Sequence, residues 1–400
     1  MPRLSASLLR SAYRKHPLLP LLLRECRDLP SARNELRWLR EHALSLVEKD
    51  RHSPGNCVKG WRTQLRSIVR ERARGKPLQY ILGDQPFGDL EILCRQGVLI
   101  PRLPETESYT IRTAQLILSH FAKSPPSHTT SPDASRRSIR ILDLCSGTGC
   151  IPLLLHTLLA PSLEDITIIG IDISPRALAL ARQNLEHNIA KGHLSARAKQ
   201  DVQFLQADIL GYQHETAQNI NSIIESTASS TSTIPSIDAI LKILSNPTSN
   251  DAGLMFDIVV SNPPYISPVE YRNGTTRRSV RLYEPKLALV PPPMQNKLHK
   301  NDASGTIDSS QVQADVFYPQ ILSISARVGA QLTVMECGDV SQARRVAQIA
   351  KSGADGHSKD AIVEIWKCDG SEDYGFTMMG PADAEDDGAR AVAISRGTMK

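Results

Sequence analysis

The sequence predicts an α/β protein with a doubly wound, mostly parallel sheet and a small helical domain before it. Between residues 139 and 366, short apolar runs rich in β-branched residues alternate with longer helical patterns, as expected of strand–helix–strand units. A turn with two glycines follows the first of these runs. Polar side chains lie at the ends of four runs, where open α/β sheets place their chemistry.

The N-terminal part predicts helices. Residues 35–47 and 61–69 each place apolar side chains at helical spacing, and Gly75 with Pro77 ends the second pattern. We therefore expect a helical domain over residues 18–77, interpreted as a substrate-docking module.

This part is also strongly basic. Residues 1–77 hold 18 Lys or Arg against 7 Asp or Glu, a net charge of +11 in a chain that carries +5. The excess indicates an acidic or nucleic-acid-bound partner, or only arginines on exposed helix faces. Residues 1–24 contain five basic and no acidic residues, which is typical of a mitochondrial transit peptide. A short presequence over residues 1–17 is expected, with a mitochondrial location or, alternatively, a cytoplasmic one.

The first strand of the sheet is expected at residues 139–144, after a β-rich connector over residues 78–107. The strand leads into Cys145-Ser146-Gly147-Thr148-Gly149-Cys150, and a helix follows over residues 151–159. Glycines at a strand-to-helix turn let the backbone approach a ligand closely. Because a third glycine is missing, the turn does not predict a pyrophosphate site.

The next two strands end in acidic residues. Residues 166–171 precede Asp172, and a helix begins after Ser174-Pro175, an N-cap with proline at the first helical position. Asp172 lies about twenty residues after the glycines, the distance at which an acidic side chain meets ribose hydroxyls. Residues 202–207 precede Asp208. A single acidic residue after a strand is often a helix cap. Four acidic or amide residues in register at the ends of the expected strands indicate a site; they are Asp143, Asp172, Asp208 and Asn262.

The fourth strand, residues 256–260, runs into Ser261-Asn262-Pro263-Pro264-Tyr265. Two successive prolines cannot continue a strand. The Asn262 side-chain carbonyl and the Pro263 backbone carbonyl can together accept both hydrogens of one planar NH2 group, with Tyr265 as a flat wall. The alternative is an ordinary Asx-Pro turn.

Five segments together resemble the release factor glutamine methyltransferases (the HemK/PrmC family) among the class I S-adenosyl-L-methionine-dependent enzymes. They are Leu78–Gly83, Ile100–Glu107, Asp143–Gly149, Asn262–Tyr265 and Tyr283–Leu289. The resemblance implies methyl transfer from S-adenosyl-L-methionine to the glutamine side-chain nitrogen of a Gly-Gly-Gln motif. The protein substrate would be a translation release factor, with a mitochondrial factor favoured, and the enzyme a monomer.

The resemblance also implies the site residues. The glutamine amide is expected at Asn262, Pro263, Pro264, Tyr265, Arg102 and Glu105. The methyl donor is expected at Asp143, Ser146, Gly147, Thr148, Gly149, Asp172, Ile173, Asp208, Ile209 and Asn262. The extra residue Leu103 departs from the family pattern, so a salt-bridged strand-to-helix junction is an equal alternative for Arg102 and Glu105.

The methyltransferase domain is expected over residues 108–369, with a later helix at 318–328 and strands at 331–336 and 361–366. Three Ser-, Thr- or Pro-rich insertions are expected to be mobile loops: 124–137, 213–253 and 291–310. An acidic, Gly-rich tail over residues 370–400 is expected to be disordered.

Two other functions compete with this one. Asn-Pro-Pro-Tyr also occurs in enzymes that methylate the exocyclic amine of adenine or guanine. Such enzymes need an aromatic, basic surface around the site. Only 4% of the residues in this chain are aromatic, which disfavours this alternative. A non-catalytic binding or assembly factor on the same fold is the second alternative. Seven scattered cysteines without a Cys-x-x-Cys pair predict neither disulfides nor a metal site, and no apolar run is long enough to cross a membrane.

Overall fold

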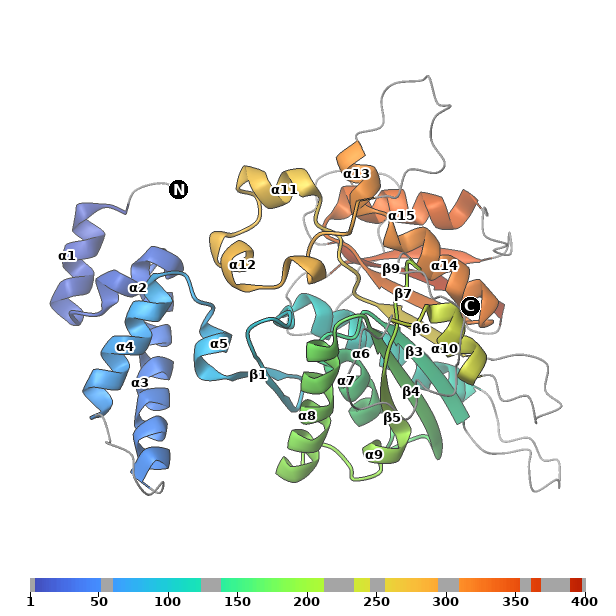
Figure 1. The fold of residues 1–400 in the computed structure, drawn as a ribbon, viewed down its shortest axis with the longest axis horizontal. Coiled ribbons are helices and arrows are strands. Elements are labelled where there is room, and N and C mark those ends of the chain that lie inside the picture. The colour runs from blue at the N-terminus through green and yellow to red at the C-terminus, as the bar shows by residue number, and fades with distance from the viewer. Residues whose placement is uncertain are drawn as a thin grey trace. The chain divides into compact units, whose positions relative to one another are not determined.

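The computed structural model describes most of the chain. The described residues are 4–51, 60–123, 138–211, 234–244, 256–293, 309–352, 361–367 and 389–397. They fall into two compact units (Figure 1). The first comprises residues 1–85, 93–100 and 274–285, and the second residues 86–92, 101–273 and 286–400. The first unit therefore extends beyond the predicted helical domain of residues 18–77, to residues 1–17, 78–85, 93–100 and 274–285.

The first unit is built mainly of helices; α1 to α5 are drawn in shades of blue in Figure 1 and α12 in yellow-orange. They are α1 (Ala6–Lys15), α2 (Leu19–Cys26), α3 (Leu29–Arg51), α4 (Trp61–Ala73), α5 (Leu78–Leu82) and α12 (Arg278–Tyr283). Leu22, Leu39 and Val69 are fully buried in its core. Arg72 donates to both carboxylate oxygens of Glu35, at 2.8 and 2.9 Å. The two predicted helices are thus present as α3 and α4, and α3 is longer than its pattern indicated.

Helix α1 lies within the segment expected as a presequence. Ser5 caps it by accepting the Leu8 amide at 3.2 Å. Ala12 is fully buried, and Leu8 and Leu9 pack against the same apolar core as α2, α3 and α4. This helix therefore contributes to the core of the first unit.

A seven-stranded sheet forms the centre of the second unit, in the order β5-β4-β3-β6-β7-β9-β8. Its strands are β3 (Ser138–Leu144), β4 (Asp165–Asp172), β5 (Val202–Gln206), β6 (Ile258–Ser261), β7 (Leu332–Glu336), β8 (Ile362–Lys367) and β9 (Ala389–Ser395). The first five are parallel to one another, whereas β9 is antiparallel to both β7 and β8. A separate two-stranded sheet pairs β1 (Asp84–Phe87) with β2 (Leu90–Leu93).

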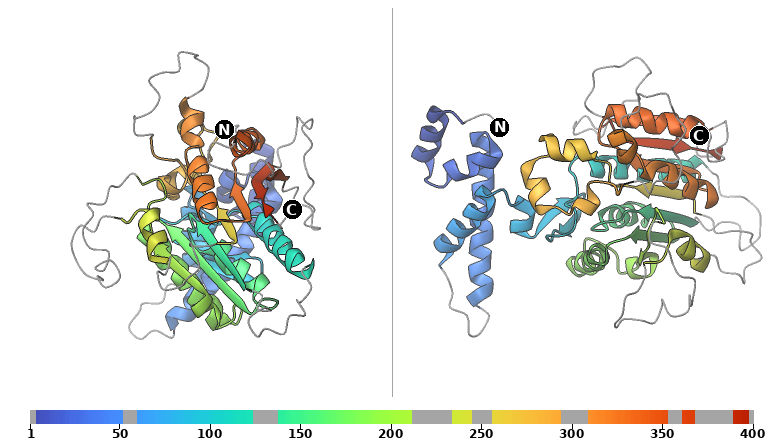
Figure 2. Two further views of the ribbon diagram at one scale, coloured as in Figure 1. Left: turned by 90° about the vertical axis from the view of Figure 1, so that its right-hand side faces the viewer. Right: turned by 45° about the horizontal axis from the view of Figure 1, so that its top comes forward.

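Helices cover both faces of the large sheet, as Figures 1 and 2 show. One apolar cluster joins the sheet to α6 (Glu105–Lys123), α7 (Cys150–Leu159), α8 (Pro175–Lys191) and α9 (Ala198–Asp201). A second joins it to α10 (Ile237–Leu244), α14 (Phe317–Arg327) and α15 (Val340–Ser352). Successive residues alternate between the clusters; Ile141 belongs to the first and Leu142 to the second, as the strand period of two requires. Short elements complete the unit: α11 (Pro268–Asn273), η2 (Lys286–Ala288) and α13 (Ser309–Ala314).

Three predicted boundaries are wrong. Residues 389–395 of the predicted disordered tail form β9, inserted between β7 and β8, because Val392 and Ile394 bury one face against the second cluster. Residues 237–244 of the second predicted loop form α10, whose Ile237, Ile240 and Leu241 are buried. Residues 309 and 310, at the end of the third, begin α13. The first predicted loop, residues 124–137, lies outside the described residues.

The fold class is confirmed. A parallel sheet covered by helices on both faces and completed by an antiparallel strand inserted next to its edge is the class I methyltransferase architecture, as the sequence predicted. Within the described ranges, no helix is long and apolar enough to cross a membrane.

Candidate active site

The carboxyl ends of five parallel strands bring the strand-end residues to one edge of the sheet. Leu144 of β3 pairs with Ile171 of β4 and with Ser261 of β6, and Ser261 pairs with Met335 of β7. Neighbouring strands therefore end at nearly the same level. The polar residues at those ends line one edge, where doubly wound sheets bind their ligands.

The turn after β3 adopts the left-handed conformations that its glycines allow. Gly147 and Gly149 have φ of 55° and 77°, and Cys145 has φ of 65°, a region that a non-glycine residue seldom enters. A Cβ on Gly149 would lie 2.8 Å from the Phe204 ring, whereas a Cβ on Gly147 would meet no atom within 4 Å. Packing therefore requires the glycine at 149, while the space beside Gly147 is open.

Asp172 closes this turn from the end of β4. Its Oδ2 accepts the Gly147 amide at 2.8 Å and its Oδ1 accepts the Ser174 amide at 2.8 Å. Burial raises the pKa of Asp172, although both backbone donors favour its charged form. Ser174 in turn caps α8 through the Ala177 amide. The predicted strand-end acid and the predicted N-cap therefore form one bonded unit with the glycine turn.

Asp143 lies deeper, inside β3, and is fully buried. The Ser146 hydroxyl donates to its Oδ2, but its Oδ1 has no hydrogen-bond partner among the described residues. Burial raises the pKa of Asp143 to about 8, with a further contribution from the Asp172 charge. A buried carboxylate with an unpartnered oxygen suits a cationic ligand group.

The remaining predicted donor-site residues lie at the same edge. Asp208 is buried and its Oδ1 accepts the Leu210 amide at 2.9 Å, while Ile209 is buried in the second apolar cluster. The Ile173 carbonyl accepts Gln206 Nε2 at 2.9 Å, and the Thr148 carbonyl accepts Asn184 Nδ2 at 2.9 Å. The structure thus brings together the polar residues predicted at the ends of β3, β4 and β5.

The Asn-Pro-Pro-Tyr loop leaves β6 and is fixed at several points. Pro263 and Pro264 are buried. The Tyr265 carbonyl accepts Gln342 Nε2 at 3.2 Å, and the Ile266 amide donates to the Leu289 carbonyl at 2.9 Å. These bonds hold the loop at the peptide bond between Tyr265 and Ile266.

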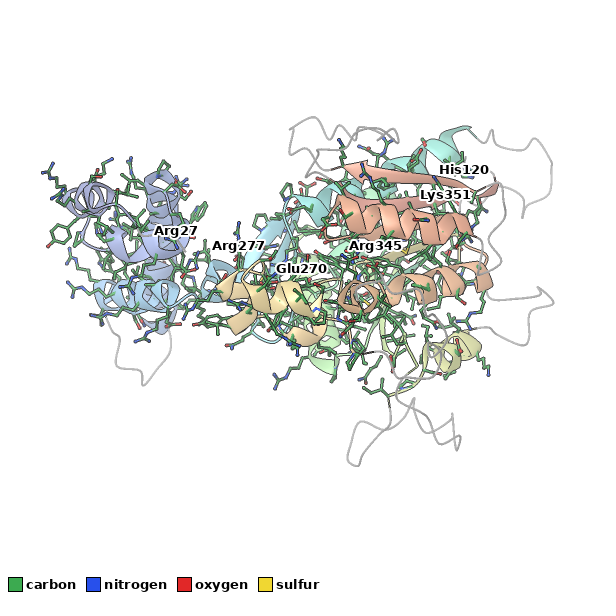
Figure 3. The ribbon with its side chains drawn as sticks, turned by 90° about the horizontal axis from the view of Figure 1, so that it is seen from above. Arg27, His120, Glu270, Arg277, Arg345 and Lys351 are labelled. Carbon is green, nitrogen blue, oxygen red and sulfur yellow. The ribbon has the colours of Figure 1, made fainter. Side chains whose placement is uncertain are left out.

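Charged side chains extend this support (Figure 3). Glu270 of α11 accepts from the amide and hydroxyl of Ser267, at 3.0 and 2.8 Å. Arg345 of α15 donates to both oxygens of Asp315, which also accepts Gln342. The loop is therefore anchored to α15 through the same glutamine that binds the Tyr265 carbonyl.

Asn262 itself donates to Glu336 at the end of β7, with Nδ2 2.7 Å from Oε2. The Thr106 hydroxyl donates to the same oxygen at 2.7 Å, and the Tyr265 hydroxyl to Oε1 at 3.1 Å. Glu336 is 1% exposed. Burial raises its pKa, while the Thr106 and Tyr265 hydrogen bonds and the Arg102 charge oppose that change.

Arg102 and Glu105 lie where the chain enters α6. The Arg102 carbonyl accepts the Thr106 amide at 3.1 Å, and Glu105 is the first residue of the helix. Arg102 is close enough to Glu336 to lower its pKa. The structure therefore brings Arg102 to the Asn262 cluster and leaves Glu105 as a residue of the helix N-terminus.

The sequence motifs contained Thr106 only as an unassigned residue, and gave neither Tyr109 nor Glu336 a role. The available signal was that Glu336 ends a fifth apolar run, as Asp172 and Asn262 do for theirs. Tyr109 is fully buried and its pKa is raised well above the ordinary value by burial and by the Glu336 and Asp143 charges.

The chain is similar in sequence to known methyltransferases. A family model described as "Methyltransferase domain" matches residues 135–275. The chain is similar to the mitochondrial MRF1 N(5)-glutamine methyltransferase MTQ1 of Saccharomyces cerevisiae, with 33% identity over 291 residues, 72% of this chain and 68% of that protein. The chain belongs to the release factor glutamine methyltransferase family.

Further relatives extend the match. The probable MRF1 mitochondrial N(5)-glutamine methyltransferase mtq1 of Schizosaccharomyces pombe is 30% identical over 366 residues, 89% of this chain and 94% of that protein. The release factor glutamine methyltransferase of Chlorobaculum tepidum is 32% identical, over 57% of each chain. Among solved structures, the N-terminal domain of human METTL16 is 14% identical, with a TM-score of 0.41 over 82% of each chain. The family is that of S-adenosyl-L-methionine-dependent methyltransferases, as the sequence predicted.

Proposed function

We propose that this enzyme methylates the side-chain amide nitrogen of the glutamine in the Gly-Gly-Gln motif of a mitochondrial release factor. Family membership supports the reaction, and two relatives that bear the words mitochondrial and MRF1 in their names support the compartment. The basic composition of residues 1–24 agrees with that location. The enzyme acts as a monomer on one factor.

The observation that carries the proposal is the arrangement of Asn262. Its Nδ2 is engaged by Glu336, so its Oδ1 is the end offered to a substrate. The Pro263 carbonyl is the second acceptor, next to Pro264, which has no N–H. Two acceptors would bind both hydrogens of the glutamine NH2 and turn its lone pair toward the methyl donor, with Tyr265 as the wall beside it.

The donor site consists of the glycine turn and the strand-end acids. We assign the ribose hydroxyls to Asp172, with Ile173 beside it, and the adenine to Asp208 and Ile209. The methionine portion lies against the turn that contains Ser146, Gly147, Thr148 and Gly149. The unpartnered Asp143 Oδ1 fits its cationic ammonium group, because a neighbouring cation favours the charged form of a carboxyl whose pKa burial raises to about 8. Arg102 and Glu105 border the substrate side.

S-adenosyl-L-methionine, when bound, supplies an electrophilic methyl carbon on a positively charged sulfur. The residues of the loop hold the glutamine nitrogen in line with that carbon, because an amide nitrogen is a poor nucleophile and orientation supplies much of the rate. Methyl transfer from the bound donor would form an N–C bond as the S–C bond breaks, and would leave the bonding pair on sulfur. The methylated nitrogen is then acidic and loses a proton to water, so the chain needs no strong base.

A methyl-transfer assay tests the proposal. The purified full chain is incubated with labelled methyl donor and three acceptors: a mitochondrial release factor, the same factor with the Gly-Gly-Gln glutamine changed to alanine, and ribosomal RNA. Label in the first acceptor alone is the expected result. Label in RNA would identify a nucleic-acid methyltransferase, and label in none of the three a non-catalytic binding factor.

A further inference from the structure

A buried carboxylate stands directly behind the proposed substrate-binding amide. Glu336 ends β7, the neighbour of β6 in the sheet, and Ser261 pairs with Met335. Asn262, the first residue after β6, and Glu336, the last residue of β7, therefore lie side by side, with Nδ2 2.7 Å from Oε2. Glu336 is 1% exposed, so no solvent competes for this bond.

Three donors converge on this carboxylate. Thr106 from α6 and Asn262 share Oε2, and the Tyr265 hydroxyl binds Oε1. A deprotonated carboxylate accepts all three at once, whereas a protonated one would have to donate to one of them. The arrangement therefore suits the charged form, with Arg102 as the nearby cation.

The bond decides which end of the Asn262 amide faces the substrate. An asparagine carries a donor and an acceptor at opposite ends, and the two are nearly equal in shape. With Nδ2 bound to Glu336, the acceptor Oδ1 is the outward end. A rotated amide would present an NH2 group to the NH2 of glutamine, and neither could accept from the other.

We propose that Glu336 is a positioning residue for methyl transfer: it fixes the orientation of the Asn262 amide and so makes it an acceptor for the substrate NH2. This inference rests on the proposed function. Thr106 and Tyr265 support it, because their hydroxyls donate to the same carboxylate. Glu336 itself contacts neither substrate nor donor.

The first test is Glu336→Gln in the full chain. Glutamine keeps the size of the side chain but offers one acceptor oxygen to three donors. We expect kcat to fall about 10²-fold, the cost of a misplaced reacting group, while the affinity for S-adenosyl-L-methionine changes less than twofold. The matched control is Glu364→Gln on β8 of the same sheet, whose carboxylate accepts Trp366 Nε1 at 3.0 Å; it should leave kcat unchanged.

A double-mutant cycle separates positioning from general structural damage. If Glu336 acts through Asn262, then Glu336→Gln should slow the wild type but not slow Asn262→Ala further. Additive losses, or a Glu336→Gln enzyme at the wild-type rate, would overturn the inference while leaving the proposed function intact. An Asn262→Ala enzyme at the wild-type rate would instead remove the proposed role of the loop.

A pH profile gives a second readout that does not depend on the folding of Glu336→Gln. Titratable or charged groups that face Glu336 are Arg102, Tyr109, Tyr265, Cys150 and Cys337. Burial raises the pKa of Tyr109 and of both thiols above their ordinary values, so Glu336 is the group of this set that changes charge on the acidic side. Thr106→Val removes one donor to the carboxylate and should move the acidic limb of the kcat profile to higher pH. An unmoved limb would contradict the role of Glu336.

Discussion

Asp172→Asn is the substitution that most directly tests the proposed donor site. Each Asp172 oxygen accepts one backbone amide, from Gly147 and from Ser174. Asparagine has one acceptor oxygen, so its NH2 group would face one of these amide donors. Leaving one amide unsatisfied costs about 1–3 kcal/mol of the free energy of unfolding.

The effect on binding is separate from this cost. The carboxylate also offers a charge-assisted hydrogen bond to a ribose hydroxyl, worth about 1.5–3 kcal/mol. Its loss should weaken S-adenosyl-L-methionine about 10- to 100-fold, because each 1.4 kcal/mol is a factor of ten. Calorimetric titration of the purified variant measures the affinity, and unfolding in urea without ligand measures the stability.

The control is Asp165→Asn at the opposite end of the same strand, where the side chain is exposed. It should change neither quantity. If Asp172→Asn lowers stability but binds the donor as tightly as wild type, Asp172 only supports the glycine turn, and the ribose assignment is refuted.

Three other predictions concern neighbouring residues. Gly147→Ala should lower the free energy of unfolding by only about 1–2 kcal/mol but abolish donor binding. Gly149→Ala should lower the free energy of unfolding further, because its Cβ would lie 2.8 Å from Phe204. Thermal unfolding measures the stability of the two variants, and calorimetry measures their donor binding. Because the folded pKa of Asp143 is about 8 and an unfolded Asp has about 3.9, the ligand-free free energy of unfolding should fall as pH rises from about 4 to 8, and Asp143→Asn should flatten this slope in urea titrations. Asn262→Ala should slow methyl transfer about 10²-fold. Asn262→Asp should bind the donor yet transfer the methyl group slowly, since it places a second carboxylate against Glu336. A wild-type rate in both variants would show that the loop is an ordinary turn with no role in methyl transfer.

The strands and their chemistry could be predicted because each strand is a short apolar run that ends at a distinctive residue. The predicted runs at 139–144 and 166–171 match β3 and β4 within one residue at each end. The carboxyl ends of parallel strands lie at the same edge of a sheet. The sequence therefore predicted that Asp172, Asp208 and Asn262 lie along one edge.

Strand β9 could not be predicted in the same way. Its sequence, Ala389–Ser395, contains only two large apolar residues, Val392 and Ile394, and follows an acidic, Gly-rich stretch typical of disorder. It is a strand because β7 and β8 offer it hydrogen bonds on both sides, which is information from distant parts of the chain. Helix α10 was missed for a different reason, because the Ser- and Thr-rich sequence around it concealed its short apolar face.

The role of Glu336 shows what separates a motif from a site. The Asn-Pro-Pro-Tyr sequence predicts an amide at a strand end, but an asparagine can offer a donor or an acceptor, and only the second suits a glutamine NH2. The choice depends on a residue 74 positions later in the chain, brought beside Asn262 by the pairing of β6 with β7. Burying that carboxylate costs desolvation free energy, and its three donors offset this cost only while it remains charged. We infer that the chain keeps a buried charge here because a neutral group could not hold the asparagine in one orientation.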